Sequence, residues 1–292
     1  MSEKDSWHLR EGAPITAELT AMRLLGGGAA YEAYLAFDEV TYGPVVVKVL
    51  RPGQADDPAG LRGLRREVAA LAAVNHPVVV RGLRHVDAGE RPHLVLEHVD
   101  GPRLSSLVRR HGPLQEQQYL PLAIDVAAAL HYFARVGYVH LDIKPSNVIM
   151  GSPARLIDLS VMRTVEAAAA LTYVIGTDAY LAPEQADPGS LGVPGPPSDV
   201  WGLGATLYHA VAGERPYAEG DPHGTTPADR HPQVTTVPPP LPGRTSSEVV
   251  KVVGACLERR PEDRPLPSEV AEALQPVLER QPRARLSFKV SR

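Results

Sequence analysis

The densest group of reactive side chains lies in residues 139–149, where apolar residues flank Asp142, Lys144 and Asn147. A further acid, Asp158, follows within another apolar run. Phosphoryl transfer needs a carboxylate that orients the attacking hydroxyl, a cation at the transferred phosphate and oxygen ligands for Mg²⁺. The types and spacing of these residues therefore indicate a phosphotransfer site.

A lysine and a glutamate earlier in the chain form a second candidate pair. Lys48 lies in the middle of the β-branched, apolar residues 44–50, which predict a strand. A lysine buried in such a strand requires an anionic partner. Glu67 is the one acid of an amphipathic helix expected over residues 60–74, and it adjoins the apolar stripe of that helix. An edge-strand lysine whose amine lies in water is left open.

Three consecutive glycines, Gly26, Gly27 and Gly28, separate two strand-like segments upstream of Lys48. Glycines allow backbone N–H groups to approach phosphate oxygens without obstruction by Cβ atoms. Because a strand follows them, the segment is neither a P-loop nor a dinucleotide-binding fingerprint. Taken alone, such a segment is more often a plain hairpin than a phosphate-binding loop.

The elements that must position these groups fall into two lobes. Residues 16–96 are mostly strand-like with one helix, whereas long helices follow residue 101, for example over 115–136 and 200–212. We predict an N-lobe over 1–97, a C-lobe over 98–280, a hinge at 97–101 and a basic tail over 281–292. Residues 216–243 are so rich in proline and glycine that we expect a long surface loop without regular structure.

Composition excludes several classes of protein. Of 292 residues, 43% are hydrophobic and 22% charged, which argues against disorder, and the net charge of −4 gives no indication of a nucleic-acid partner. The single cysteine, Cys256, excludes an internal disulfide and is expected to be a buried thiol. Without an apolar run of eighteen residues or a signal peptide, we expect a cytoplasmic protein with no membrane span.

In their order and spacing, these segments resemble the signature motifs of protein kinases, and in detail the bacterial members of the eukaryotic-like (Hanks-type) serine/threonine family. The resemblance covers about residues 24–274. It implies that Lys48 holds the α- and β-phosphates of ATP and that Glu67 is its partner. Asp142 resembles the catalytic base, Lys144 the lysine at the γ-phosphate, and Thr177 the threonine that bridges those two.

The same resemblance assigns the metal and the nucleotide. Asn147 and Asp158 match the ligands of Mg²⁺, with Mn²⁺ as an alternative ion. Residues 93–99 resemble the hinge strand, with Leu96 as gatekeeper. The expected nucleotide contacts are Gly26, Gly27, Gly28, Ala33, Val46, Lys48, Leu96, Glu97, Val99 and Ile149.

The implied fold is α+β and bilobal, with a five-stranded sheet and one helix in the N-lobe and a mainly helical C-lobe. The implied activity is ATP-dependent phosphorylation of protein serine or threonine hydroxyls, with autophosphorylation. Residues 176–184 resemble the end of an activation segment, and Arg264 matches the arginine that pairs with Glu184. The physiological substrate and the activating signal are not indicated, and a homodimer is left open.

Several positions depart from the family pattern. Tyr31 replaces the third glycine of the loop and is expected to cap the phosphates less closely. Ala33 and Val46 exchange the usual large and small residues of the adenine pocket, so we expect adenine to shift slightly toward Ala33. At residues 159–160, Leu-Ser replaces the usual Phe-Gly, which we expect to restrict the movement of that segment.

Leu141 replaces the arginine that binds an activation-segment phosphate in the family. We therefore expect activity to depend little on phosphorylation of Thr164, Thr172 or Tyr173. His140 is expected to be a packed core residue, since Asp142 already fits the role of base.

Two other functions stay open. A pseudokinase would keep the fold and lack the reaction, and the altered loop and residues 159–160 allow this alternative. A small-molecule phosphotransferase of the antibiotic or choline kinase type is a further alternative, although Lys144 and Thr177 favour a protein substrate. In the basic tail, Ser287 is a candidate autophosphorylation site, whereas a solvated tail is the simpler interpretation.

Overall fold

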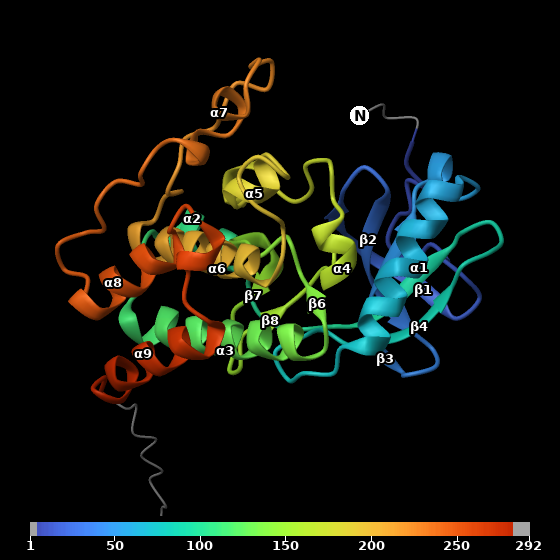
Figure 1. Ribbon diagram of the computed structural model, residues 1–292. Helices are drawn as coiled ribbons and strands as arrows, with labels where there is room; N and C mark the ends of the chain where they lie inside the picture. Colours follow the sequence, from blue (N-terminus) through green and yellow to red (C-terminus); the bar gives the residue numbers. More distant parts are fainter. Residues whose placement is uncertain (1–4, 283–292) are drawn as a thin grey trace, which may run out of the picture.

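The computed structural model describes residues 5–282, and its first part is a five-stranded antiparallel sheet in the order β1-β2-β3-β5-β4. Figure 1 shows this sheet with one long helix beside it, apart from the helical part of the chain. The elements are β1 (Leu19–Gly27), β2 (Tyr31–Asp38), β3 (Gly43–Leu50), η1 (Pro52–Gln54), α1 (Pro58–Ala73), β4 (Gly82–Val86) and β5 (His93–Glu97).

Alternation along β3 places Lys48 on the face that meets the rest of the molecule. Val45, Val47 and Val49 point to the opposite face and are buried in a small core of their own. Val46 and Lys48 share the other face, and Lys48 pairs with Ala33 of β2 and with Leu94 of β5. The strand predicted over 44–50 is confirmed.

Helix α1 begins with a side-chain cap and carries Glu67 on its buried stripe. The carboxylate of Asp57 accepts the N–H of Gly60 at 3.0 Å, and Pro58 occupies the first turn, where its missing N–H costs nothing. Leu64, Glu67 and Ala70 are the buried residues that follow at helical spacing. The helix begins two residues before the predicted start and ends one residue before the predicted end.

Beyond the hinge the chain is mainly helical, as predicted, and the two-residue strands β6 to β9 all lie within residues 138–164. The elements are α2 (Leu104–His111), α3 (Glu116–Arg135), β6 (Tyr138–Val139), η2 (Pro145–Asn147), β7 (Val148–Ile149), β8 (Arg155–Leu156), β9 (Arg163–Thr164), α4 (Val165–Ala169), η3 (Asp178–Tyr180), α5 (Pro183–Ala186), α6 (Pro196–Ala212), α7 (Pro227–Arg230), η4 (Pro232–Val234), α8 (Ser247–Cys256), η5 (Pro261–Asp263) and α9 (Pro267–Glu279).

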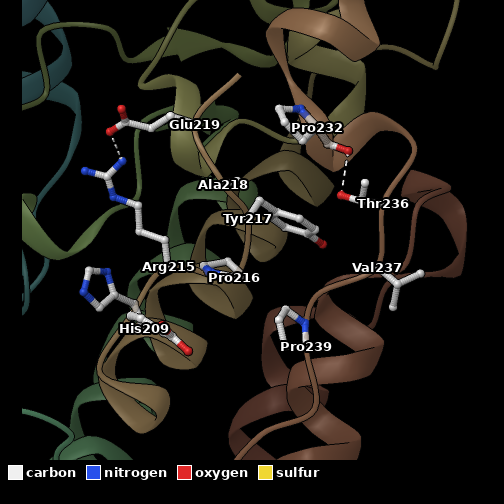
Figure 2. Close-up of a pocket in the computed structure, with 11 residues that line it drawn as sticks. His209, Arg215, Pro216, Tyr217, Ala218, Glu219, Pro232, Thr236, Val237 and Pro239 are labelled. Carbon is white, nitrogen blue, oxygen red and sulfur yellow. Dashed lines mark hydrogen bonds and ion pairs between the residues drawn. The ribbon is translucent and has the colours of Figure 1, made fainter. Parts of the chain in front are cut away.

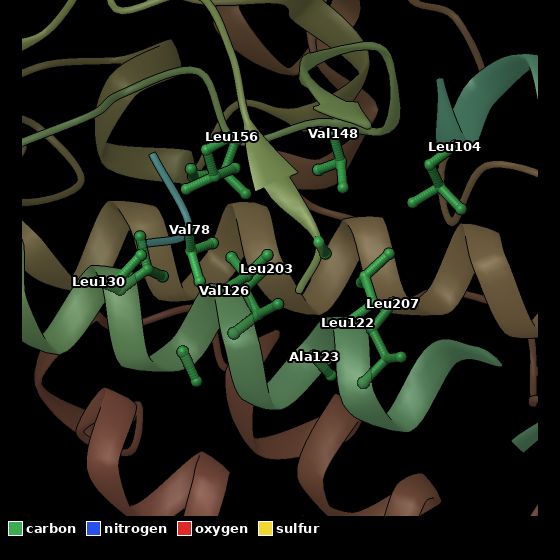
Figure 3. Packing of buried hydrophobic residues seen from close by; sticks show 14 of the residues in the cluster. Val78, Leu104, Leu122, Ala123, Val126, Leu130, Val148, Leu156, Leu203 and Leu207 are labelled. Carbon is green, nitrogen blue, oxygen red and sulfur yellow. The ribbon is translucent and has the colours of Figure 1, made fainter. Parts of the chain in front are cut away.

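The main core lies between α3, α6 and the β7–β8 hairpin. Figure 3 shows Val126 of α3 and Leu203 of α6 meeting below Leu156 of β8. These apolar contacts pack the hairpin against α3 and α6. Cys256 is 1% exposed in the same core, which confirms the predicted buried thiol.

The prediction that residues 216–243 lack regular structure is wrong in part, because α7 and η4 lie within them. Thr226 caps α7 by accepting the N–H of Asp229 at 3.1 Å, and the carboxylate of Asp229 accepts the N–H of Thr226 at 2.9 Å. Prolines at the first turn of each short helix do not oppose helix formation there. Because proline is so abundant in this segment, the sequence analysis did not identify the first turns of α7 and η4.

The C-terminal end of the described chain lies against α3. The predicted tail begins at Gln281, whose amide donates to Glu116 of α3 at 2.6 Å, whereas Ser287 lies outside the described residues. Among residues 5–282, every helix is too short or too polar to cross a lipid bilayer.

Candidate active site

Lys48, Glu67 and Asp158 form one ion cluster between the two lobes. The Nζ atom of Lys48 donates to both carboxylate oxygens of Glu67 at 2.7 Å and to Oδ1 of Asp158 at 2.9 Å. Lys48 is 9% exposed and Glu67 is 1% exposed, so the alternative of a strand lysine in water does not hold. The cluster joins β3, α1 and the segment after β8.

Charge within this cluster fixes its ionisation. Burial on its own would lower the pKa of Lys48, but Asp158 and Glu67 raise that pKa above its ordinary value. Burial on its own would likewise raise the pKa of Asp158, but the Lys48 ammonium holds it well below its usual range. Lys48 is therefore a cation and Asp158 an anion at neutral pH.

A second group surrounds the carboxylate of Asp142. Lys144 donates to Oδ2 at 2.7 Å, and the hydroxyl of Thr177 donates to Oδ1 at 2.7 Å. Lys144 also donates to the Thr177 hydroxyl, so the three side chains close a triangle. Asn147 Nδ2 completes the group by donating to Oδ2 of Asp142 at 3.1 Å. The carboxylate is thereby held in one orientation.

The backbone before Asp142 is strained and is pinned from α6. Leu141 has a φ of 64°, a conformation that a branched side chain adopts only when its surroundings impose it. The two carboxylate oxygens of Asp199 accept the N–H groups of His140 and Leu141, each at 2.7 Å. Burial raises the pKa of Asp199 to about 7, against the effect of these two N–H bonds. Helix α6 thus sets the position of Asp142.

The β7–β8 hairpin brings Asn147 and Asp158 to the same end of the site. Val148 pairs with Leu156, and the N–H of Ile157 donates to the Asn147 carbonyl at 2.9 Å. Asn147 turns its Nδ2 toward Asp142, which leaves its Oδ1 for another partner. One carboxylate and one amide oxygen suit Mg²⁺, which takes few protein ligands and completes its shell with phosphates and water.

The other possible metal ligands of the described residues are consistent with a site that has only two protein ligands. Within residues 5–282, no three histidine, cysteine or acidic side chains gather as a complete metal cage would require. A divalent ion at Asn147 and Asp158 would consequently depend on oxygens from a bound phosphate.

A cleft is lined by members of both groups and has two parts that share Ala33, Lys48, Arg103, Ile157 and Asp158. The larger part, about 590 Å³, is lined by Gly26, Gly27, Gly28, Lys48, Lys144, Asn147 and Asp158, together with other residues. The smaller part, about 250 Å³, is lined by Ala33, Val46, Leu96, Glu97, Val99 and Ile149, together with other residues. The structure thus brings every predicted nucleotide contact to one of the two parts.

Outside the predicted hinge, the sequence analysis missed five residues of the smaller part: Arg23, Leu25, Val80, Arg103 and Ile157. Leu25 and Ile157 directly precede predicted site segments, so their positions carried a signal. Val80 and Arg103 lie in connections whose course the sequence does not specify.

Tyr31 turns its ring into the cleft, which the sequence did not indicate. Its ring centroid lies 4.9 Å from Nζ of Lys48, within cation–π range. The hydroxyl is buried without a partner among the described residues and lies beside Gly63 of α1, where a Cβ atom would be 3.5 Å away. The ring of Tyr31 therefore covers the Lys48–Glu67 pair on the side of the cleft.

The hydroxyl of Tyr31 is expected to contribute nothing to stability. Tyr31→Phe removes an unpaired buried group, so we expect an unfolding free energy equal to or above that of the wild type. Tyr34→Phe is the matched control, because its hydroxyl donates to Glu32 at 2.8 Å, and we expect it to cost about 1 kcal/mol. Urea denaturation of both variants measures the difference, and a larger loss for Tyr31→Phe would contradict the assignment.

His140 is fully buried and stacks on Phe133, as expected for a core residue. Burial lowers the pKa of its imidazole, which is therefore neutral at pH 7. Leu159 is also fully buried, so it fills an apolar role.

The segment that ends in Glu184 is fastened to the C-lobe by a buried ion pair. Arg264 Nη1 and Nη2 donate to the two oxygens of Glu184 at 2.7 and 2.8 Å, and neither side chain is exposed. The hydroxyl of Ser198 donates to the same carboxylate at 2.7 Å. The predicted pairing of these two residues is present.

Figure 2 shows a separate cavity of about 670 Å³ between the end of α6 and residues 214–239. His209, at its wall, stacks on Tyr180 of η3, and Nδ1 lies 2.7 Å from the tyrosine hydroxyl. Gln233 of η4 also donates to the carbonyl of Asp178 at 2.7 Å. The proline-rich segment therefore contacts residues 176–184 directly.

Comparison with known proteins agrees with this geometry. The model of the protein kinase domain matches residues 19–277. The chain belongs to the protein kinase family. Serine/threonine-protein kinase PknB of Mycobacterium leprae is 34% identical to this kinase domain over 251 residues, and PknB of Mycobacterium tuberculosis is 32% identical over 252. Serine/threonine-protein kinase PknA of M. tuberculosis is 31% identical over 262 residues.

These matches cover 82% of this chain for PknB and 86% for PknA. They span only 40% of the length of PknB and 59% of the length of PknA. The similarity therefore concerns the kinase domain of these relatives. The family match and these serine/threonine-protein kinase relatives confirm the expected Hanks-type family.

Proposed function

We propose that this kinase domain transfers the γ-phosphoryl group of Mg-ATP to serine or threonine hydroxyls of proteins. The observation that carries the proposal is the triangle of Asp142, Lys144 and Thr177, whose Lys144 lines the same cleft as Lys48 and Asp158 of the ion cluster. A carboxylate held in one orientation by two donors, next to a cleft lined by two lysines, is suited to orient a hydroxyl for in-line attack.

Each residue has a role in this proposal. The smaller part of the cleft would take adenine, with backbone groups of Glu97 and Val99 at its edge. Lys48, kept in place by Glu67, would bind the α- and β-phosphates. Lys144 would neutralise charge at the γ-phosphate, and Asp142 would accept the proton of the attacking hydroxyl.

Asn147 and Asp158 would hold Mg²⁺, for which Mn²⁺ is an alternative. The ion supplies charge stabilisation at the phosphate oxygens when it is bound. The anionic state of Asp158, maintained by Lys48, keeps an oxygen ligand ready at neutral pH.

A protein substrate is favoured over a small molecule by the surroundings of Thr177. Residues 176–184 contact His209 of α6 and Gln233 of η4, and Thr177 of the same segment bonds Asp142, so an extended peptide-sized segment lies beside the carboxylate. PknB and PknA are serine/threonine kinases by name, and a common fold alone does not decide the acceptor.

The decisive test is incubation of the purified chain with Mg²⁺ and γ-³²P-labelled ATP, a general protein acceptor, and choline or an aminoglycoside in parallel. We expect label on serine or threonine after acid hydrolysis of the protein. Label on the small molecule alone would indicate the alternative phosphotransferase. Nucleotide binding without any transfer would identify a pseudokinase.

We also propose that activity depends little on phosphorylation of the activation segment. Leu141 is 2% exposed and belongs to an apolar cluster with Val139, Ala168 and Leu171. These contacts fasten α4 and the following turn to the catalytic loop without a phosphate. Gln185 strengthens the connection by donating to the carbonyls of Leu141 at 2.9 Å and Ile175 at 3.1 Å.

Phosphatase treatment is accordingly expected to leave turnover unchanged, although Thr164, Thr172 and Tyr173 lose any phosphate. Leu171→Ser is expected to lower turnover, since it places a hydroxyl in the apolar cluster and loosens α4. Initial-rate measurements on treated and untreated enzyme check the first outcome. Loss of most activity after phosphatase treatment, confirmed by mass spectrometry, would contradict the proposal.

A further inference from the structure

The glycine-rich loop is fastened on its outer side by a buried arginine. Arg51, directly after β3, donates from Nε to the carbonyl of Gly28 at 2.8 Å and from Nη1 to Oε1 of Glu32 at 3.1 Å. The side chains of Arg51 and Glu32 are 10% and 3% exposed. A carbonyl at the tip of the loop is thus bonded to a fixed, charged donor.

The N-terminal segment, residues 5–9, bonds to both Arg51 and Glu32. Arg51 Nη1 donates to the carbonyl of Asp5 at 2.7 Å, and the carboxylate of Asp5 accepts the N–H of Gly53 at 2.9 Å. Trp7 donates its N–H to Glu32 at 3.2 Å and its indole N–H to the carbonyl of Leu50 at 2.7 Å. The guanidinium is therefore confined on several sides, and its position does not depend on nucleotide.

Alternation along β2 shows that Arg51 lies on the face of the loop opposite the cleft. Tyr31 points inward, over Lys48, so its neighbour Glu32 points outward. Arg51 binds Glu32 and therefore shares that outer side. The approach is close, because a Cβ atom on Gly27 would lie 3.2 Å from Nη2 of Arg51 and 2.4 Å from the carbonyl of Tyr31.

A trans peptide unit points its C=O and its N–H in opposite directions. The bond from Arg51 turns the Gly28 carbonyl outward, so the N–H of Ala29 in the same peptide unit points toward the cleft. Within residues 5–282 this N–H donates to no other group, and both Gly28 and Ala29 line the larger part of the cleft. An N–H fixed in this way is prepared for an anionic oxygen.

We propose that Arg51, anchored by Glu32 and residues 5–9, is a positioning residue that aims the Ala29 N–H at a phosphate of the bound nucleotide. The inference rests on the proposed use of ATP. It adds an element on the outside of the sheet that sets phosphate affinity without touching the nucleotide. Arg51 orients the Ala29 N–H, while Lys48 provides the positive charge that contacts the phosphates.

Binding of ATP and of adenosine to Arg51→Lys tests this inference, because adenosine lacks the phosphates. Lysine keeps a charge opposite Glu32, but one ammonium cannot reproduce the planar fork that reaches Gly28, Glu32 and Asp5 together. We expect ATP to bind about tenfold more weakly, as for loss of one charge-assisted hydrogen bond, and adenosine to bind unchanged. Arg65→Lys is the matched control, because Arg65 pairs with Asp87 on the surface of the same lobe.

A second variant guards against misfolding of the first. Glu32→Gln with Arg51→Met removes both buried charges together, so neither is left unpaired, and the same selective loss of ATP affinity is expected. Equal weakening of ATP and adenosine, or no change in either, would overturn the inference. If the variants lose affinity for ATP selectively while the wild-type protein transfers no phosphate, the proposed function fails and the role of Arg51 stands.

Discussion

Asp142→Asn is expected to lower the rate of phosphoryl transfer about a thousandfold while the affinity for ATP stays the same. Asparagine keeps the shape of the side chain and can still accept from Lys144, which bonds Asp142 at 2.7 Å. It cannot take up the proton of the attacking hydroxyl. The loss should therefore appear in kcat, with little change in KM for ATP.

Asp263→Asn is the matched control, since this carboxylate lies on the surface of the C-lobe at η5. We expect wild-type kcat for that variant. Steady-state kinetics with a protein acceptor measures all three proteins. Equal rates for the wild type and Asp142→Asn would show that Asp142 is not the base.

Arg264→Ala is expected to reduce the free energy of unfolding by about 3–5 kcal/mol, since it leaves the carboxylate of Glu184 buried and unpaired. Besides the two bonds to Glu184, the guanidinium donates to the carbonyls of Pro197 at 2.9 Å and Glu258 at 2.8 Å. It also lies over Trp201, 5.0 Å from the ring centroid. All of these contacts are lost together.

The neighbouring Arg260 provides the control for this change. Its pair with Glu262 is on the surface, where 70% of the arginine side chain is exposed, and Arg260→Ala should cost less than about 1 kcal/mol. Replacing Glu184 by Gln in addition to Arg264 by Met should recover part of the stability, because no buried charge remains. Chemical denaturation that finds Arg264→Ala as stable as Arg260→Ala would contradict this account of the activation segment.

The Lys48–Glu67 pair of the central ion cluster could be predicted because each member stands out from its own element, whereas no pattern in the sequence pairs Lys48 with Asp158. A lysine within an apolar strand and a single acid on an amphipathic helix leave few alternatives for pairing. The group around Asp142 was accessible for a related reason, since its members lie within a short segment between apolar flanks. Only the distant Thr177 required the family resemblance.

Other features depend on backbone conformation and could not be predicted. The positive φ of Leu141 is imposed by Asp199, which lies 58 positions later and bonds the Leu141 N–H. The inward turn of Tyr31 depends on the register of β2 against β3, and the contacts of Arg51 depend on the fold of residues 5–9. Local sequence patterns carry little information on such non-local contacts.

The helix α7 was missed for a different reason. Proline was treated as a sign of irregular structure over residues 216–243, whereas here it stands at the first turns of short helices. The capping pair of Thr226 and Asp229 was the signal in the sequence.

A structure of the chain with Mg²⁺ and a non-hydrolysable ATP analogue tests most directly whether one metal-bound triphosphate joins the two side-chain groups. We expect oxygens of Asn147 and Asp158 on the metal, the amine of Lys48 on the α- and β-phosphates, and the γ-phosphate facing Asp142. A nucleotide bound away from these side chains, or a metal that contacts neither Asn147 nor Asp158, would contradict the proposed mechanism.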